Sequence, residues 1–359
     1  MQISDTMMAA VLHGDGDIRF ERIPTPELAL GSVLVHVRAA GVCGSDLPRV
    51  FQSGAFFYPI VLGHEFSGEV AAAAPDVTSV RVGQRVAGAP LVPCMHCDDC
   101  MRGYYASCRS YSFLGSKKQG AFAEYVAMPA MCAVPLPDGV SYEQGAMLEP
   151  ATVGLHALFC AGFQGGGDVA VLGGGTIGLF VMQWARIYGA RSVTVFDISE
   201  ERLTFLRGYG VDHTVDTTKD GFLETCMALT GGAGFSHVFE TAGQAMTMNL
   251  AFRIAATKAD VCFVGTPHAD LTFPPATWEL FNRRELRLTG PWMSYSAPYP
   301  GREWTLTAHH LARGDLRIDE KLVAACHPMR EVAAAFGRFQ DGPVAGKVLL
   351  LNDGEDAKC

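Results

Sequence analysis

Residues 165–197 read GGGDVAVLGGGTIGLFVMQWARIYGARSVTVFD, and this stretch decides the fold of the chain. A short apolar run at 169–172 breaks at three successive glycines, and the apolar residues that follow recur with helical spacing as far as Tyr188. A second apolar run at 192–196 ends on Asp197. This order of strand, glycine turn, helix and strand predicts the first unit of a parallel sheet that binds a dinucleotide.

The glycines of this turn have the spacing G-x-G-x-x-G, and each has a separate physical task. Gly173 permits a tight turn, Gly175 lets the backbone approach a pyrophosphate, and Gly178 lets the helix pack closely against the strand. Thr176 and Ile177 would present free backbone N–H groups at the start of the helix, where a pyrophosphate binds. An ordinary glycine-rich turn is the alternative, and the flanking strand, helix and acidic residue argue against it.

The acidic residue at the end of the second strand indicates which dinucleotide binds. Asp197 lies nineteen positions after Gly178, where a carboxylate accepts a hydrogen bond from the adenosine ribose 2′-hydroxyl. Ile198 and Ser199 follow it, so a 2′-phosphate would meet a carboxylate with no basic residue next to it. The sequence therefore predicts NAD rather than NADP, with Arg202 as a further residue of the cofactor site.

Size and composition exclude several classes of protein. The chain has 359 residues, of which 49% are hydrophobic and 18% are charged, and this suits a globular protein of two domains. Its net charge of −9 argues against a nucleic-acid surface. The opening sequence MQISDTMMAAVLHGDGD lacks the regions of a secretory signal, and no uncharged apolar run reaches the length of about 18 residues that spans a membrane. We therefore expect a cytoplasmic protein without nucleic-acid or membrane partners.

Four closely spaced cysteines give the strongest local pattern in the first half of the chain. Their spacing is C-x2-C-x2-C-x7-C, formed by Cys94, Cys97, Cys100 and Cys108. Four thiolates in a loop with few apolar side chains are typical of a closed, structural zinc site. An iron–sulfur cluster is the rival interpretation, but bacterial ferredoxins have three residues before the last cysteine and a proline after it, whereas this chain has seven residues and then Arg109. Incidental buried thiols are the remaining alternative.

A second set of metal-binding residue types lies upstream of these cysteines. Cys43 stands in the sequence Cys-Gly-Ser-Asp, and the pair His64-Glu65 follows Gly63. Sulfur, nitrogen and oxygen are the ligand atoms that zinc takes in open sites. Glu149 lies in an apolar helical stretch at 145–159, where a carboxylate is costly unless it is paired or bound to a metal. A helix-terminal carboxylate without a metal is the alternative for Glu149.

The remaining patterns predict how the domains are arranged along the chain. Short strands dominate the first part, among them the alternating run at 32–39. Between residues 200 and 290, helical and strand patterns alternate, which predicts an α/β fold with a doubly wound parallel sheet. A helical segment at 331–339 and a strand at 347–351 follow, and we expect them to return to the first domain.

Five motifs occur in an order that resembles the zinc-dependent medium-chain alcohol and polyol dehydrogenases. They are Cys43-Gly-Ser-Asp, Gly63-His-Glu, the cysteine lobe at 94–108, Glu149-Pro and the glycine turn at 173–178. The resemblance covers nearly the whole chain. It implies a GroES-like, β-rich catalytic domain at 1–152 that includes the structural zinc lobe, a Rossmann NAD-binding domain at 153–293, and a return to the catalytic domain at 294–359.

The same resemblance implies roles for single residues. A catalytic zinc would be surrounded by Cys43, His64, Glu65 and Glu149, with water or a substrate oxygen completing the shell. Ser45 would pass the proton of the alcohol towards solvent. Members that act on simple alcohols often have a second cysteine in the late position, and its absence near Glu149 favours a polyol substrate. Two zinc ions per chain, NAD, and a homodimer or homotetramer are implied.

Within that family, the sequence most resembles the galactitol-1-phosphate dehydrogenases. This resemblance depends on the segments 43–49, 58–60, 62–68, 114–118, 149–156 and 291–296. It implies hydride transfer between NAD and galactitol 1-phosphate, which becomes tagatose 6-phosphate. Arg49, Lys117 and Lys118 are the basic residues expected to bind the phosphate, and a solvated turn is the alternative for the two lysines. Where those relatives carry arginines in the turn, this chain carries lysines, which contact phosphate as point charges rather than bidentate forks.

Other functions suit parts of the same pattern. An unphosphorylated polyol such as sorbitol or galactitol, or threonine, would be the substrate of a dehydrogenase of the same fold. A non-catalytic dinucleotide-binding protein is the alternative from another class. The joint presence of Cys43, His64, Glu65, Glu149 and Ser45 argues against it, because a protein without catalysis has no need of a metal shell and a proton relay.

Overall fold

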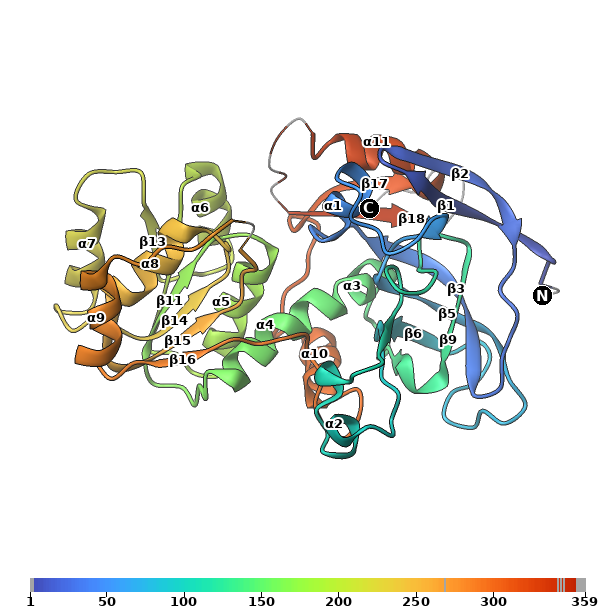
Figure 1. The fold of residues 1–359 in the computed structure, drawn as a ribbon, viewed down its shortest axis with the longest axis horizontal. Coiled ribbons are helices and arrows are strands. Elements are labelled where there is room, and N and C mark those ends of the chain that lie inside the picture. Colours follow the sequence, from blue (N-terminus) through green and yellow to red (C-terminus); the bar gives the residue numbers. More distant parts are fainter. Residues whose placement is uncertain (1–2, 268, 341, 343, 345, 353–359) are drawn as a thin grey trace. The chain divides into compact units, whose positions relative to one another are not determined.

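The computed structural model describes residues 3–267, 269–340, 342, 344 and 346–352, and the chain divides into two compact units (Figure 1). Pro150–Ser294 forms one of them, called the parallel-sheet unit below. Met1–Glu149 and Tyr295–Cys359 form the other, called the β-rich unit. The β-rich unit is therefore discontinuous in sequence.

The parallel-sheet unit is built on six parallel strands in the order β13-β12-β11-β14-β15-β16. The strands are β11 (Asp168–Leu172), β12 (Ser192–Asp197), β13 (His213–Asp216), β14 (Phe235–Glu240), β15 (Ala255–Phe263) and β16 (Arg287–Thr289). After α4 (Leu148–Cys160), the connecting helices are α5 (Thr176–Ile187), α6 (Glu200–Arg207), α7 (Phe222–Leu229), α8 (Ala245–Ile254) and α9 (Pro275–Arg283). The predicted doubly wound parallel sheet is confirmed, and α9 is an element that the sequence pattern did not predict.

The glycine turn lies where the direction of the strand order reverses. From β11 the chain adds β12 and β13 on one side, and it then crosses to add β14, β15 and β16 on the other. Ligands of such sheets bind beyond the carboxyl ends of the strands at this reversal. Gly173 follows β11 and Thr241 follows β14, and the Thr241 hydroxyl donates hydrogen bonds to the carbonyl oxygens of Leu172 and Gly173, at 3.1 and 2.9 Å.

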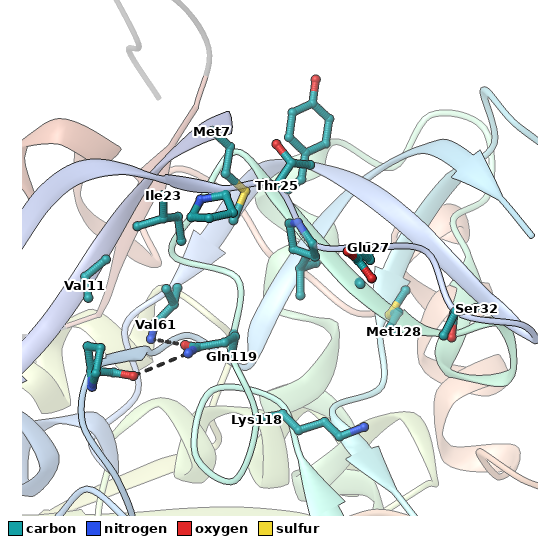
Figure 2. A pocket seen from close by; sticks show the side chains of 18 of the residues that line it. Met7, Val11, Ile23, Thr25, Glu27, Ser32, Val61, Lys118, Gln119 and Met128 are labelled. Carbon is teal, nitrogen blue, oxygen red and sulfur yellow. Dashed lines mark hydrogen bonds between the residues drawn. The ribbon is translucent and has the colours of Figure 1, made fainter. Parts of the chain in front are cut away.

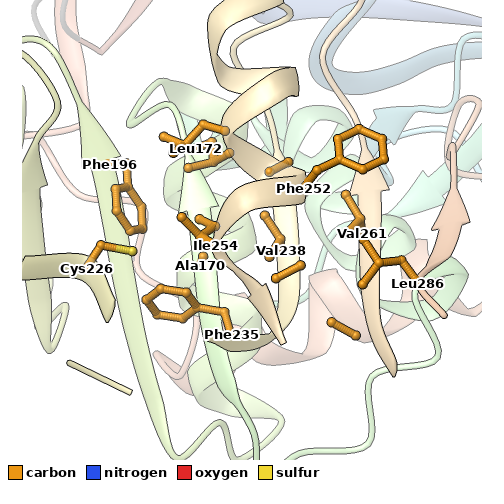
Figure 3. Packing of buried hydrophobic residues seen from close by; sticks show 14 of the residues in the cluster. Ala170, Leu172, Phe196, Cys226, Phe235, Val238, Phe252, Ile254, Val261 and Leu286 are labelled. Carbon is orange, nitrogen blue, oxygen red and sulfur yellow. The ribbon is translucent and has the colours of Figure 1, made fainter. Parts of the chain in front are cut away.

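Buried apolar side chains form a continuous core in this unit (Figure 3). Ala170, Val238 and Val261 come from three adjacent strands and are fully buried. Phe252 and Ile254, at the end of α8, belong to the same cluster. All residues of β11 are buried, as expected for a parallel strand that is covered on both faces, and this rigid strand carries the glycine turn at its end.

The β-rich unit contains one large sheet and two small ones. The large sheet has the order β10-β6-β5-β3-β18-β17, with β9 also paired to β3, while β2-β1-β4 and β7-β8 form the others. The strands are β1 (Thr6–Gly14), β2 (Asp17–Pro24), β3 (Ser32–Gly41), β4 (Ile60–Val61), β5 (Glu65–Ala73), β6 (Arg85–Gly88), β7 (Leu91–Val92), β8 (Ser112–Phe113), β9 (Tyr125–Pro129), β10 (Ala133–Pro135), β17 (Val323–Pro328) and β18 (Lys347–Leu351). Its helices include α1 (Asp46–Phe51), α2 (Asp98–Met101), α3 (Tyr142–Ala146), α10 (Arg302–Arg313) and α11 (Val332–Gly337).

Strand β3 is the centre of the large sheet. It pairs with β5 along its length, with β9 over its first half, and with β18 at its end. β18 comes from the end of the chain, and its Leu349 lies opposite Gly41. Within the described ranges, no helix combines the length and the apolar character that a membrane crossing requires.

Candidate metal and dinucleotide sites

Cys43, His64 and Glu65 come together at one end of the β3–β5 pair. Gly41, the last residue of β3, lies directly opposite Glu65, the first residue of β5. Because Cys43 follows β3 and His64 precedes β5, this register brings the three side chains together. One ligand atom from each residue lies within 4.8 Å of the other two. Sulfur, imidazole nitrogen and carboxylate oxygen suit a zinc ion with an open coordination position, so these residues fit the metal that the sequence predicts.

Two glycines make room for this donor group. A Cβ atom at Gly41 would collide with the Glu65 carboxylate and would lie 2.8 Å from Cε of Lys347. Gly63, next to His64, has a φ of +93°, and a Cβ there would lie 2.5 Å from the Phe122 ring. A larger residue at either position would therefore displace the site.

Asp46, the first residue of α1, is a buried carboxylate beside His64 whose role was not predicted. Its Oδ2 accepts a hydrogen bond from the Cys43 N–H at 3.1 Å, and its Oδ1 lies 3.5 Å from His64 Nδ1. Burial alone would lower the pKa of His64, but the charges of Asp46 and Cys43 outweigh this and raise that pKa well above its usual value. A carboxylate behind a histidine orients metal-ligating imidazoles. The sequence signal for Asp46 is its place in the Cys-Gly-Ser-Asp motif.

Lys347 is a second buried residue of this site that was not predicted. Its Nζ forms an ion pair with Oε2 of Glu65. Burial would lower the pKa of Lys347, but the Glu65 carboxylate reverses the effect and raises it. The ion pair occupies one oxygen of Glu65, which leaves the other for a metal. In the sequence, Lys347 is visible only as a charge at the start of an apolar strand.

Glu149 lies at the edge of this site. It is half-buried in the first turn of α4, and burial raises the pKa of its carboxyl to about 7. The charges of His64 and Lys347 oppose this rise, and those of Glu65 and Asp46 add to it, so all four lie close enough to act on Glu149. The tight donor group found among the described residues consists of the other three predicted ligands and does not include Glu149.

Ser45 connects the donor group with solvent. Its hydroxyl donates to Cys43 Sγ at 3.4 Å and accepts a hydrogen bond from Arg49 Nη1 at 3.1 Å. The residue itself is exposed. A hydroxyl with a metal ligand on one side and water on the other has the position that a proton relay requires.

The four cysteines of the lobe also converge, with their sulfur atoms within 4.8 Å of one another. The backbone N–H groups of Cys94 and Cys97 donate to the sulfurs of Cys108 and Cys94, at 3.2 and 3.3 Å. Backbone N–H groups of His96 and Cys97 lower the pKa of Cys94 to about 5, while burial raises that of Cys100 to about 12. Four sulfurs with supporting N–H donors match a closed, structural zinc site.

The three basic residues predicted to bind phosphate lie in three different surroundings. Arg49 Nη1 donates to the carbonyl oxygen of Ser45 at 2.6 Å and lies 3.4 Å from Asp46 Oδ1, which ties it into α1. Lys117 Nζ lies 3.6 Å from the centroid of an aromatic ring, that of Tyr111. Lys118 lines a cavity of about 710 Å³ whose walls come largely from the first strands and β9, and which the metal-site residues do not line (Figure 2).

In the parallel-sheet unit, the geometry of the glycine turn agrees with the task expected of each glycine. Gly173 has a φ of +105°, which a tight turn requires. A Cβ at Gly178 would collide with the carbonyl oxygen of Gly173, so helix and strand could not pack as they do. Gly175 precedes α5, is exposed, and has open space where a Cβ would lie. Thr176 and Ile177 begin α5, and their N–H groups are at its N-terminus.

Asp197 accepts a hydrogen bond from the glycine turn, next to which it was predicted to bind the cofactor. Its Oδ2 accepts the N–H of Gly174 at 2.7 Å, and its Oδ1 accepts the N–H groups of Ile198 and Ser199 at 2.8 and 3.0 Å. Arg202 Nη1 lies 3.4 Å from Oδ2. Helix α6 thus places the Arg202 guanidinium beside the Asp197 carboxylate. The residues directly after Asp197, Ile198 and Ser199, gave no sign of this positive charge.

Two protein families match the sequence. Residues 29–138 match the alcohol dehydrogenase GroES-like domain, and residues 176–308 match the zinc-binding dehydrogenase family. The first match contains the donor group and the four cysteines. The second begins at the first residue of α5.

Three relatives of known name cover most of the chain. Galactitol 1-phosphate 5-dehydrogenase of Escherichia coli K12 is 38% identical over 346 residues, which are 96% of this chain and 100% of that protein. Sorbitol dehydrogenase of Bacillus subtilis is 33% identical over 270 residues, or 74% and 76% of the two chains. L-Threonine 3-dehydrogenase of Rhizobium etli is 33% identical over 245 residues, or 67% and 71%.

Solved structures share the whole fold. That of galactitol-1-phosphate dehydrogenase from Escherichia coli gives a TM-score of 0.92 at 38% identity and covers 96% of this chain and 100% of its own. A zinc-binding dehydrogenase from Sinorhizobium meliloti 1021, bound to NADP, gives 0.86 at 28% identity over 97% and 100%. An alcohol dehydrogenase from Escherichia coli CFT073, complexed with NADH, gives 0.88 at 26% identity over 97% and 100%. Both kinds of dinucleotide thus occur in structures of this fold.

Proposed function

Because the chain belongs to the zinc-containing medium-chain alcohol dehydrogenase family, we propose that it oxidises galactitol 1-phosphate, a polyol phosphate, to tagatose 6-phosphate with NAD. The converging Cys43, His64 and Glu65 carry the assignment of the reaction, since they form an open metal site in a zinc-binding dehydrogenase. The choice of substrate is supported by 38% identity over 96% of the chain to galactitol 1-phosphate 5-dehydrogenase.

The residues around the donor group have separate tasks in this reaction. A zinc ion bound there would act as a Lewis acid that makes a substrate hydroxyl acidic near neutral pH, and NAD would accept the hydride. Cys43 and Glu65 supply negative charge to the metal site, and Asp46 holds the imidazole of His64 in place. Glu149, at the edge of the site, is our candidate for a fourth ligand.

Ser45 carries the proton in this proposal. Its Oγ contacts Cys43 Sγ on the side of the metal site, and the residue is exposed to solvent. Arg49 donates to the same Oγ, so it fixes the orientation of the hydroxyl without taking its proton. The hydroxyl can therefore accept the proton of the substrate alcohol and release its own to water.

The cofactor site supports NAD as the hydride acceptor. The N–H groups of Thr176 and Ile177 at the start of α5 would bind the pyrophosphate, with Gly175 leaving the approach open. Asp197 would accept a hydrogen bond from the ribose. Arg202 neutralises part of the Asp197 charge, so the discrimination against NADP is expected to be smaller than the sequence alone suggests.

We also propose two zinc ions per chain and a cytoplasmic homodimer or homotetramer. The two donor groups, one with four cysteines and one with Cys43, His64 and Glu65, support the metal content. The family resemblance supports the assembly. Light scattering on the purified protein, together with metal analysis, tests both parts.

A substrate screen tests the proposed function directly. The reduction of NAD is followed with galactitol 1-phosphate, galactitol, sorbitol and threonine, each over a range of concentrations. We expect kcat/KM to be highest for galactitol 1-phosphate. No preference for the phosphate ester over the free polyols would reject this substrate.

An unphosphorylated polyol is the second candidate substrate. The 33% identity to sorbitol dehydrogenase favours it. So does Glu149, a carboxylate at the edge of the metal site in the late position where simple-alcohol enzymes often have a second cysteine. The same screen separates the two candidates, because sorbitol or galactitol would then give the highest kcat/KM.

A further inference from the structure

Two basic residues beside the metal site, Lys347 and Arg49, already contact buried acids. Lys347 forms its ion pair with Glu65, and Arg49 contacts Asp46 and the backbone of Ser45. Both acids are almost fully buried. Each base already contacts a carboxylate, with which a phosphate on the substrate would have to compete.

Lys117, in contrast, is held by aromatic rings. Its Nζ lies 3.6 Å from the ring centroid of Tyr111 and 5.7 Å from that of Phe56. None of the ion pairs in the described part of the chain involves Lys117. A ring face attracts and positions an ammonium group but does not neutralise its charge. The N–H donors of Lys117 that point away from the rings can therefore bind an anion.

The ring that holds Lys117 is two positions from a residue that contacts His64. Tyr111 lies directly before β8, and Phe113 is the last residue of that strand. The Phe113 ring lies 5.6 Å from the His64 imidazole, measured between centroids. The N–H of Lys117 donates to the carbonyl oxygen of Phe113 at 2.9 Å, which fixes the turn. Phe113 thus covers His64, and Tyr111 next to it carries the ammonium group.

Phe56 approaches Lys117 from the segment between α1 and β4. It follows α1, the helix that begins directly after Ser45 and contains Asp46. Its side chain is 66% exposed, so the ring presents a free face at the surface. The rings that hold Lys117 therefore belong to two segments, one whose Phe113 contacts His64 and one that follows α1.

Lys118, although adjacent in sequence, has different surroundings. Figure 2 shows its side chain at the edge of the cavity that Val61 and Gln119 also line, with its amino end directed away from Gln119. Gln119 closes this region by accepting the N–H of Val61 at 2.5 Å and donating to the carbonyl oxygen of Pro59 at 3.4 Å. The cavity that Lys118 lines includes no residue of the donor group.

We propose that Lys117, positioned on the rings of Tyr111 and Phe56, is the cation that recognises the phosphate of the substrate. It sets the preference for polyol phosphates over free polyols, and Arg49 and Lys118 do not. This inference rests on the proposed function, since it requires a phosphorylated substrate. It assigns recognition of the anion to a single point charge rather than to a cluster of bases.

Two substitutions of adjacent residues test this assignment. Lys117→Gln and Lys118→Gln remove the same charge from neighbouring positions, and kcat/KM is measured for galactitol 1-phosphate and for galactitol. In Lys117→Gln we expect the ratio of the two values to fall by about tenfold or more, chiefly through KM, as for the loss of one charge-assisted contact. Lys118→Gln should keep the wild-type ratio. Inorganic phosphate, used as a competitive inhibitor, should bind more weakly to Lys117→Gln alone.

Variants of the ring that holds Lys117 extend the test. Tyr111→Phe keeps an aromatic face and should keep the preference, whereas Tyr111→Leu should lower it. Zinc content and circular dichroism establish that each variant is folded and loaded with metal. Lys117→Arg keeps the charge and should keep most of the preference, which gives a readout if Lys117→Gln does not fold.

The possible failures are distinguishable. If the wild-type protein prefers the phosphate ester and the two glutamine variants have equal ratios, the role of Lys117 is wrong and the proposed function stands. If Lys118→Gln alone loses the preference, the assignment is overturned in favour of the cavity. If the wild-type protein does not prefer the phosphate ester, the proposed function fails and this inference fails with it.

Discussion

A single sulfur atom, Cys43 Sγ, joins the metal site to the hydroxyl that we propose as the proton carrier. It belongs to the donor group with His64 and Glu65, and it accepts the hydrogen bond of Ser45. We expect Cys43→Ala to abolish turnover and to remove one of two zinc ions per chain, while NADH binding persists because the glycine turn is part of the other unit. Metal analysis and fluorescence titration with NADH measure these effects.

Cys160→Ala is the matched control for this substitution. Cys160 is a half-buried thiol of the parallel-sheet unit that belongs to neither donor group found among the described residues. Its replacement should leave the zinc content and turnover near wild-type values. Full activity of Cys43→Ala would contradict the metal mechanism.

Asp197 has both a structural contact and a proposed contact with the cofactor. Asp197→Asn keeps an oxygen that can accept the Gly174 N–H, whereas Asp197→Ala removes both the acceptor and the charge. We expect the Kd for NAD to rise about tenfold or more in the alanine variant, since a hydrogen bond to a charged group contributes about 1.5–3 kcal/mol. Preference for NAD over NADP should weaken in both variants, because Arg202 is freed. Calorimetric titration with each dinucleotide measures this, and an unchanged NAD affinity would show that the ribose contact is misplaced.

At the scale of elements, the connection from β11 to α5 needs two of its glycines for different reasons. A methyl group at Gly178 would collide with the backbone of Gly173, whereas one at Gly175 would enter open space. Gly178→Ala should therefore lower the free energy of unfolding by about 1–3 kcal/mol. Gly175→Ala should cost about 1 kcal/mol or less but weaken NAD binding, since its methyl group would occupy the approach to the N–H groups of α5.

Denaturant unfolding and NAD titration of both glycine variants separate these effects. We expect Gly178→Ala to be the less stable variant. We expect Gly175→Ala to bind NAD more weakly per folded molecule. Equal losses of stability with no selective loss of NAD affinity in Gly175→Ala would contradict the separate tasks.

The cysteine lobe is an element whose stability depends on its metal. Cys100 is buried and its sulfur lies 3.9 Å from that of Cys94, but the lobe contributes no atom to the other donor group. Cys100→Ser should lower the zinc content and the thermal midpoint, while kcat per folded molecule changes much less. Metal analysis and calorimetry measure this, with Cys160→Ser as a control. A loss of kcat at full thermal stability would assign the lobe a direct part in the chemistry.

At the scale of the whole molecule, the free energy of unfolding should change with pH in the acidic range. The Arg191 guanidinium and the Ser192 hydroxyl hold the pKa of Asp168 below its usual value. A carboxyl whose pKa is lower in the folded state than in the unfolded chain contributes stability above about pH 4, and this contribution is lost as the pH falls below that value. The free energy of unfolding should therefore decrease on acidification.

Asp168→Asn isolates one part of this dependence. The variant should be less stable than the wild type by about 1 kcal/mol or less near neutral pH, because Arg191 is largely exposed, and the difference should shrink below about pH 4. Glu201→Gln, at an exposed carboxylate of α6, should show no such change. Comparing variants at each pH cancels any loss of zinc that they share. A difference that grows on acidification would contradict the assignment.

Local patterns predicted the parallel-sheet unit well, because each signal lies within a few residues. The turn at 173–178 has a strand before it and a helix after it, and the structure places β11, α5 and β12 within two residues of the expected positions. The helices α9 and α10 were not predicted. α9 begins at Pro275 and buries none of its residues fully, although Leu280 and Phe281 pack against the core of the unit.

The environment of the metal site could be predicted only in part. Cys43, His64 and Glu65 were identified by residue type and spacing, and the structure brings them together. The contact of Lys347 with Glu65 depends on the register of β18 against β3, which joins the two ends of the chain. Pairing over such a separation leaves no local pattern in a sequence. The same holds for Lys117 and Lys118, which only their packing distinguishes.

The pairing of β18 with β3 also determines the order in which a newly made chain can be completed. A ribosome adds about 5–20 residues per second, so the end of β3 waits for tens of seconds before β18 leaves the exit tunnel. The parallel-sheet unit has all its strands before that moment and can fold during synthesis. Until β18 has been made and has emerged, Glu65 lacks its counter-ion and the last residues of β3 lack their partner on one side. A message truncated before codon 347 would therefore yield a folded parallel-sheet unit joined to an incomplete β-rich unit in which β3 has an exposed edge. We expect chaperones to bind such a product and proteases to degrade it.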